Sequence, residues 1–245
     1  MQDNVQNDFT YKCDLVWSAC EVMLKNFEYL SKKCPEVLRV CDEFFEYVQN
    51  VAVLKIYVNL TNEVLNTSLV PSFILHILNP FATYSNTSIL HGAIPVTYML
   101  LRNILEGVIR AVYGDLVLTE LSYIKKREEV ASKRLRDIIE DERIKKYVPE
   151  KVLKKALDLW IKTSSYAHSL TRRGKEGLIP RAEDYISKHG GPPSYGVIPL
   201  PTTYEMSEAD VEELHELAKT IREIKLVVED MLSAWARAYI KISVK

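Results

Sequence analysis

Apolar side chains recur at steps of three and four residues through most of this chain, and this spacing restricts what it can fold into. Residues three and four apart share one face of an α-helix, whereas residues on one face of a strand are two apart. In the first such stretch the apolar positions are Cys13, Val16, Trp17, Cys20, Met23, Leu24, Phe27 and Leu30. The longest stretch, from Val211 to Tyr239, predicts a helix of about 45 Å at about 1.5 Å per residue. That helix either braces its own chain, the simpler interpretation, or pairs with a second copy.

We therefore predict an all-α fold, a single-domain bundle of about six to eight helices over residues 1–245. No segment has the two-residue alternation of a convincing strand. The predicted parts are an N-terminal helical hairpin (9–66), a buried uncharged segment (67–118), basic helices (119–173), an irregular Gly/Pro-rich loop (174–206) and a long C-terminal helix (207–243). The loop holds five of the eight Gly and five of the ten Pro, and loops of this length are commonly functional or mobile.

The formal net charge of −1 hides an uneven distribution of 32 basic and 33 acidic residues. Residues 1–101 hold 6 basic and 10 acidic side chains, residues 102–181 hold 19 and 12, and residues 182–245 hold 7 and 11. The overall balance excludes a uniformly basic nucleic-acid coat and an acidic tail protein. The basic section complements either the acidic helices of its own chain or a separate partner, and self-complementarity is the interpretation to test first.

The N-terminal sequence lacks the basic and apolar regions of a secretory signal, which predicts a cytoplasmic protein. Residues 64–101 contain no Asp, Glu, Lys or Arg. Prolines divide this stretch into apolar pieces shorter than the roughly 18 residues of a membrane span, which disfavours a membrane location. A scarcity of Gln with abundant Lys, Glu and Ile is typical of a thermophile.

Four cysteines form a symmetric pattern of two pairs, each with six residues between its members: Cys13, Cys20, Cys34 and Cys41. Four buried free thiols are the simplest interpretation. Disulfides are the alternative, since intracellular bridges occur in hyperthermophiles. In a helical hairpin, however, Cys20 would lie about 15 Å from its helix end, too far from Cys34 for a bridge. No pair has the short spacing of a structural zinc site, so we predict no metal, and we predict no cofactor.

Three charged residues at steps of four lie within an otherwise apolar helix predicted from Val96 to Tyr113. They are Arg102, Glu106 and Arg110, and their spacing puts them on one face. A buried charge needs a partner, so one interpretation is a structural Arg–Glu–Arg ladder. The other is a ligand site, in which Glu106 stays ionised between two guanidinium groups while an arginine donates to an anion.

A cluster of hydroxyl residues surrounds His168 at the end of a helix predicted to begin at Pro149. It reads Thr-Ser-Ser-Tyr-Ala-His-Ser over residues 163–169. One interpretation is a hydrogen-bonded helix end, where the helix carbonyls favour the protonated imidazole. The other places His168 across a cavity from Arg102 and Glu106, as candidate catalytic residues. The candidate ligand-binding residues are then Arg102, Arg110, Tyr166, Arg172 and Arg173.

These two clusters carry a family resemblance over about a third of the chain. The step from Arg102 to Glu106 in an apolar helix, followed by Tyr166-Ala167-His168-Ser169, resembles all-helical prokaryotic families grouped with abortive-infection and HEPN-type domains. The resemblance implies a role in prokaryotic defence. HEPN ribonucleases use Arg, four to six residues, then His, and no Arg of this chain precedes a His at that distance. The resemblance therefore implies a member without the ribonuclease pair.

Four lysines of the basic section are candidates for contacts with a nucleic-acid backbone: Lys145, Lys146, Lys154 and Lys155. Acidic residues interleave with them, which is equally typical of a solvated, salt-bridged face. The chain lacks the phosphate-loop, zinc-peptidase, serine-hydrolase and dinucleotide motifs. We therefore predict a binding protein whose target is a partner protein, a second copy of itself or a nucleic acid. The alternatives are an enzyme acting on an anionic substrate through Arg102, Glu106 and His168, and a structural or oligomerisation protein.

Overall fold

The computed structural model describes the backbone of residues 2–167 and 204–243, and this part of the chain is helical with no strand. Side chains are described at residues 17–165 and 204–239. The elements are α1 (Gln2–Lys33), α2 (Pro35–Tyr47), the π-helical η1 (Val48–Tyr57), α3 (Asn62–Thr67), α4 (Leu69–Phe73), the π-helical η2 (Ile74–Leu78), α5 (Asn79–Leu90), α6 (Ile94–Val117), α7 (Tyr123–Ser132), α8 (Leu135–Glu140), α9 (Glu142–Lys145), α10 (Glu150–Ala167), the 3-10 turn η3 (Glu208–Asp210) and α12 (Val211–Ser243). The predicted all-α fold is confirmed. The predicted loop at 174–206 lies almost entirely outside the described residues.

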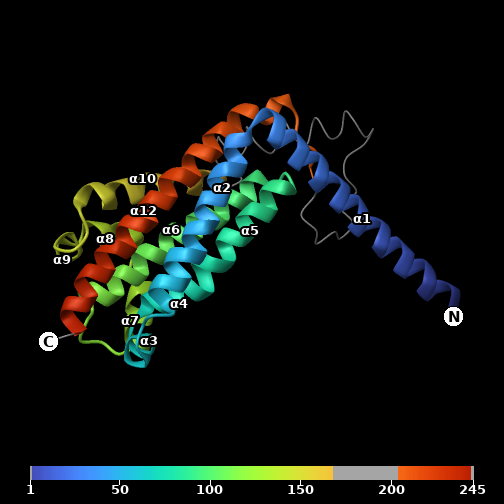
Figure 1. Cartoon of the computed structure of the whole chain (residues 1–245). Helices are drawn as coiled ribbons and strands as arrows, with labels where there is room; N and C mark the ends of the chain where they lie inside the picture. Colours follow the sequence, from blue (N-terminus) through green and yellow to red (C-terminus); the bar gives the residue numbers. More distant parts are fainter. Residues whose placement is uncertain (1, 168–203, 244–245) are drawn as a thin grey trace.

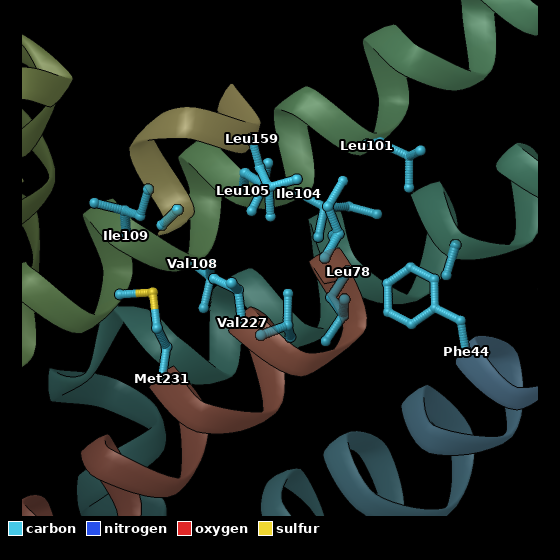
Figure 2. Packing of buried hydrophobic residues seen from close by; sticks show 14 of the residues in the cluster. Phe44, Leu78, Leu101, Ile104, Leu105, Val108, Ile109, Leu159, Val227 and Met231 are labelled. Carbon is cyan, nitrogen blue, oxygen red and sulfur yellow. The ribbon is translucent and has the colours of Figure 1, made fainter. Parts of the chain in front are cut away.

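Helix α6 is at the centre of the bundle, with α4, α5, α10 and α12 packed around it (Figure 1). Pro95 suits its first turn, because the N–H that proline lacks would be unpaired there. Leu105 and Val108 of α6 belong to one buried cluster with Leu159 of α10 and Val227 of α12 (Figure 2). This packing fixes the position of α6, which carries both of the charged clusters described below.

Helix α12 braces the bundle along its length. Ser207 and Asp210 form a capping box before it, in which the Asp210 carboxylate accepts the backbone N–H of Ser207 at 2.9 Å. Apolar side chains from Leu214 to Trp235 are buried on the face that packs against α2, α6 and α10. Helix α12 therefore braces its own chain, and pairing with a second copy stays a prediction.

Acidic residues of α12 also pair with basic residues of α10. Lys155 Nζ lies 2.8 Å from Glu223 Oε1, and Lys162 forms an ion pair with Glu216. The basic section of the sequence and the acidic C-terminal helix are thus complementary at their contact. Part of the uneven charge distribution is therefore matched within the chain.

The sequence predicts basic helices over 119–173, and the structure divides the first half of this section into α7, α8 and α9. The first break lies where the guanidinium group of Arg110 donates to the carbonyls of Val130 and Lys133. The second lies at Asp141, which accepts the hydroxyl of Tyr113 at 2.7 Å. Both partners belong to α6. Contacts with α6 therefore end these helices. The spacing of apolar residues within the segment does not predict such contacts.

The two N-terminal helices differ from the long hairpin predicted over 9–66. They meet at Cys34, and the first half of α1 extends clear of the other helices (Figure 1). Asn26 fixes the point where α1 leaves the bundle, since its amide donates to the carbonyls of Leu90 and Tyr204, each at 2.8 Å. These bonds tie α1 to the end of α5 and to the chain that enters α12.

Three of the four cysteines are described, and their thiols are free. Burial raises the pKa of Cys34, and it raises the pKa of Cys41 to about 12. Cys20 is exposed, which corrects the prediction of four buried thiols. Cys20 lies on the face of α1 that also carries Trp17 and Leu24, which are 70% and 65% exposed. The side chain of Cys13 lies outside the described residues.

Candidate functional site

An open cavity of about 500 Å³ lies between α6, α8 and α10. Its charged lining consists of Arg102, Glu106, Arg110, Arg134, Arg136 and Asp137. Its apolar wall consists of Leu135, Leu157, Trp160 and Ile161. The predicted site residues Arg102, Glu106 and Arg110 therefore lie together in a concave site. With four arginines against two carboxylates, the formal charge of its lining is +2.

Glu106 is the central residue of the Arg–Glu–Arg ladder. Its Oε1 accepts a hydrogen bond from Arg110 Nε at 2.9 Å, and its Oε2 lies 3.7 Å from Arg102 Nη2. The indole N–H of Trp160 donates to Oε2 at 3.3 Å. The three ladder side chains are still 21 to 28% exposed. The ladder is therefore fully paired yet open on one side to the cavity.

Arg102 joins the ladder to the serine-rich end of α10. Its Nε donates to Ser164 Oγ at 2.9 Å, and its guanidinium carbon lies 5.2 Å from the ring centroid of Trp160. A cation above an indole face is an attractive contact. The two polar clusters singled out in the sequence therefore meet, and Ser164 is the residue through which they do so.

Arg110 has a different role from Arg102. Its Nη1 donates to the carbonyl of Lys133 at 3.0 Å and also to that of Val130, while its Nε is bound to Glu106. These bonds hold the end of α7 against α6. Arg110 was predicted to bind a ligand, but its donors are largely taken up by the protein, so it positions the wall of the cavity.

Arg134 and Arg136 form the outer rim of the cavity. Both are exposed, and neither guanidinium group forms a hydrogen bond or an ion pair with any residue that the structure describes. They flank Leu135, which is buried and anchors this turn to the core. The sequence places both arginines in the basic section without assigning them to a site, because no helical spacing connects them to Arg102.

Several predicted site residues cannot be placed in this cavity. The backbone of Tyr166 belongs to the last turn of α10, but its side chain is not described. His168, Arg172 and Arg173 lie outside the described residues. The catalytic constellation of Arg102, Glu106 and His168 therefore stays a prediction.

The four lysines predicted to contact nucleic acid are mostly paired within the chain. Lys145 bonds Glu142, Lys154 Nζ lies 2.9 Å from Glu150, and Lys155 pairs with Glu223 of α12. Lys146 forms no such pair with the described residues. This arrangement is that of a salt-bridged solvent face, in which paired lysines contribute less positive potential to a partner.

A second charged cluster, which no pattern in the sequence indicates, lies at the other end of α6. Asp115 is completely buried, and its carboxylate accepts the backbone N–H groups of Leu69 at 2.8 Å and Val70 at 3.1 Å. It also accepts the hydroxyl of Ser68 and the indole N–H of Trp235, the latter at 3.1 Å. The carboxylate therefore holds the start of α4 and the end of α12 against α6.

Lys126 supplies the opposite charge in this cluster. Its Nζ lies 3.5 Å from Asp115 Oδ1 and donates to the carbonyl of Thr67 at 3.1 Å. Burial raises the pKa of Asp115, and hydrogen bonds from Ser68 and Leu69, together with the charge of Lys126, oppose that rise. The carboxylate of Asp115 and the ammonium group of Lys126 are both bonded to other groups of the protein. We therefore assign it to the stability of the fold.

No described helix is long and apolar enough to cross a bilayer, and no group of three or more potential metal ligands gathers among the residues that the structure describes. Comparisons of the chain with protein-family models, with curated proteins and with solved structures found no match.

Proposed function

We propose that this protein is a binding protein whose cavity between α6, α8 and α10 takes a small ligand that carries a phosphate or carboxylate group. The observation that supports this proposal is the pair Arg134 and Arg136, which stand unpaired at the rim of a cavity of about 500 Å³. A guanidinium group presents a planar fork of N–H donors that matches the oxygens of a carboxylate or phosphate.

The rest of the lining supports the same ligand class. A net charge of +2 attracts an anion, and the Arg102 guanidinium is already oriented by Ser164 and Trp160. The wall formed by Leu135, Leu157 and Ile161 is apolar, so it accommodates a hydrocarbon or aromatic part of the ligand. A small amphipathic anion uses both surfaces.

Binding is favoured over catalysis by the state of Glu106. Both of its oxygens face donors of the protein, so this carboxylate already holds Arg110 on one side and Arg102 and Trp160 on the other as part of the cavity wall. The described lining contains no Ser, Cys or His that could act as a nucleophile or base beside it. The alternatives are an enzyme that uses His168 and the HEPN-like role in defence.

Isothermal titration calorimetry with inorganic phosphate, pyrophosphate and a mononucleotide tests the proposal. The double variant Arg134→Ala/Arg136→Ala should weaken binding of the best of these ligands by about tenfold or more, since it removes two charge-assisted donors. The matched control is Arg127→Ala/Lys151→Ala, which removes the same charge from exposed residues outside the cavity. It should bind nearly as well as the natural protein.

Two results would contradict the proposal. One is equal binding by both double variants, which would mean that only the overall charge matters. The other is binding of a short single-stranded RNA with no binding of any small anion, which would favour the nucleic-acid alternative. Binding that weakens as salt is raised is expected in either case, because exposed charges are screened.

A further inference from the structure

Helix α1 has apolar side chains on two faces, and only one of them is covered. Asn26 and Leu30 are buried against the bundle, and Met23 is partly buried. On the other face, Trp17 is 70% exposed and Leu24 is 65% exposed. We call the exposed face the outer stripe, and its described members are Trp17, Cys20, Leu24 and Phe27.

The outer stripe is continuous, which distinguishes it from scattered apolar side chains on a surface. Its members follow one another at steps of three, four and three residues, the spacing of the seam in a two-stranded helical coiled coil. Single exposed apolar residues are normal, whereas a contiguous apolar patch marks an interaction surface. The half of α1 that begins the stripe also stands clear of the bundle, so a long partner has room beside it (Figure 1).

We propose that the outer stripe binds the same stripe of a second copy, with the two α1 helices antiparallel. The steps of three, four and three read the same in both directions. An antiparallel copy therefore places Trp17 opposite Phe27 of the second chain, and Cys20 opposite its Leu24. Every apolar side chain of the stripe then meets an apolar partner, and one symmetry axis between residues 20 and 24 satisfies both chains.

The charges beside the stripe agree with this orientation. The side chain of Glu21 has no hydrogen bond or ion pair with the described residues, and Glu21 lies four residues from Lys25. The antiparallel arrangement brings Glu21 of each chain within reach of Lys25 of the other. Lys25 now bonds Glu205 at 3.1 Å between side chains that are both 58% exposed. Exposed ion pairs of this kind are weak and exchange partners readily.

The area is sufficient for a reversible dimer. The exposed parts of Trp17, Leu24 and Phe27 amount to roughly half of the ~800 Å² that each partner contributes to a standard interface. Flanking side chains along the same helices supply the remainder. An interface of this size is expected to be concentration-dependent.

Sedimentation of the full chain tests the association. The natural protein should approach the mass of two 28.2-kDa chains as concentration rises. Leu24→Glu should weaken the association by about tenfold or more, because it places a charge in the seam. Leu226→Glu is the control, since Leu226 of α12 is 52% exposed and lies outside the stripe. A mass of one chain up to roughly 0.2 mM, or equal effects of the two variants, would overturn the proposal.

Oxidative cross-linking tests the orientation, in a chain that carries Cys13→Ser. With antiparallel helices, Leu24→Cys places a new thiol opposite Cys20 of the second chain, so a linked dimer should form rapidly. The parent chain should link poorly, because the two Cys20 residues are then offset along the helices. Rapid linking of the parent through Cys20 alone would overturn the antiparallel arrangement. Circular dichroism of each variant shows whether the helical fold is kept.

Discussion

Glu106 and Asp115 are carboxylates on the same helix, nine residues apart, and their surroundings are opposite. Asp115 is fully buried and has a lysine, two backbone amides, a hydroxyl and an indole around it. Glu106 is 28% exposed, and the cavity beyond it has two unpaired arginines at its rim. Around Asp115, every charged and polar donor is bonded within the protein. Around Glu106, the guanidinium groups of Arg134 and Arg136 at the rim are not bonded to the described residues. We infer that the cluster around Asp115 stabilises the fold and that the site around Glu106 is available to a ligand.

The largest expected effect on stability is at the buried charged cluster around Asp115. Asp115→Ala leaves Lys126 buried without its counter-charge, so we expect a loss of about 3 to 5 kcal/mol in the free energy of unfolding. Asp115→Asn keeps the shape and should cost less, which keeps the test useful if the alanine variant does not fold. Urea denaturation at neutral pH measures both.

Asp137→Ala is the control for this experiment. Asp137 is an exposed carboxylate at the cavity, and its removal should change the free energy of unfolding by no more than about 0.5 kcal/mol. A loss below about 1 kcal/mol for Asp115→Ala would mean that the buried cluster does not hold α4 and α12 against α6.

Removing the carboxylate of the Arg–Glu–Arg ladder should lower the stability of the protein and raise its affinity for an anion. Glu106→Ala leaves Arg102 and Arg110 without their carboxylate, which should cost about 1 to 2 kcal/mol of stability. The same change makes the cavity more positive, so phosphate should bind more tightly. Urea denaturation and a calorimetric titration of the same sample separate the two effects. A parallel loss of stability and of anion affinity would indicate that Glu106 shapes the site and does not merely offset its charge.

The pH dependence of stability should differ between two carboxylates, Asp141 beside α6 and Asp115 within it. The guanidinium of Arg143 beside Asp141, and the hydroxyl of Tyr113, hold the pKa of Asp141 well below its usual range. A carboxyl whose pKa falls on folding stabilises the protein above its unfolded pKa, and this contribution is lost as the pH falls through the folded pKa. Asp115, whose pKa is raised by burial, has the opposite dependence.

Asp141→Asn should therefore cost about 1 kcal/mol at neutral pH, and this cost should shrink steadily as the pH falls below the usual pKa of an aspartate toward the depressed pKa of Asp141. Thermal unfolding of the two proteins at several pH values measures the difference. A difference that is independent of pH would show that the Asp141 hydrogen bonds stabilise the fold without their charge.

The smallest effect on stability is expected at the rim of the cavity. Arg134→Ala/Arg136→Ala should change the free energy of unfolding by no more than about 0.5 kcal/mol, because neither side chain bonds to the described part of the protein. Urea denaturation of this variant checks that its lost anion affinity is not a consequence of unfolding. A loss of more than about 2 kcal/mol would make these arginines structural.

Local patterns in the sequence predicted that the chain is helical. Tertiary contacts decided where several of the helices end. Pro35 and Pro95 lie in the first turns of α2 and α6, where proline suits a helix. The breaks within 119–147 depend on contacts with Arg110 and Tyr113, which lie on another helix. Periodicity within one segment does not contain that information.

The site was predictable to a similar degree. The steps of four from Arg102 to Arg110 correctly placed three charges on one face, and their meeting with the end of α10 follows only from the packing of α6 on α10. Arg134 and Arg136 became part of the site because the chain turns at the start of α8. The outer stripe of α1 has the spacing of an ordinary core face, since the sequence does not show that the helix leaves the bundle.

Hydrogen–deuterium exchange with and without phosphate tests the central contrast most directly. If the cavity binds an anion and the buried cluster does not, phosphate should slow exchange of the amides of residues 133–140 and 159–165. Residues 68–73 should exchange at an unchanged rate, because no strong donor of the Asp115 cluster is left for a ligand. Unchanged exchange around the cavity at saturating phosphate, or equal slowing of both regions, would contradict this account.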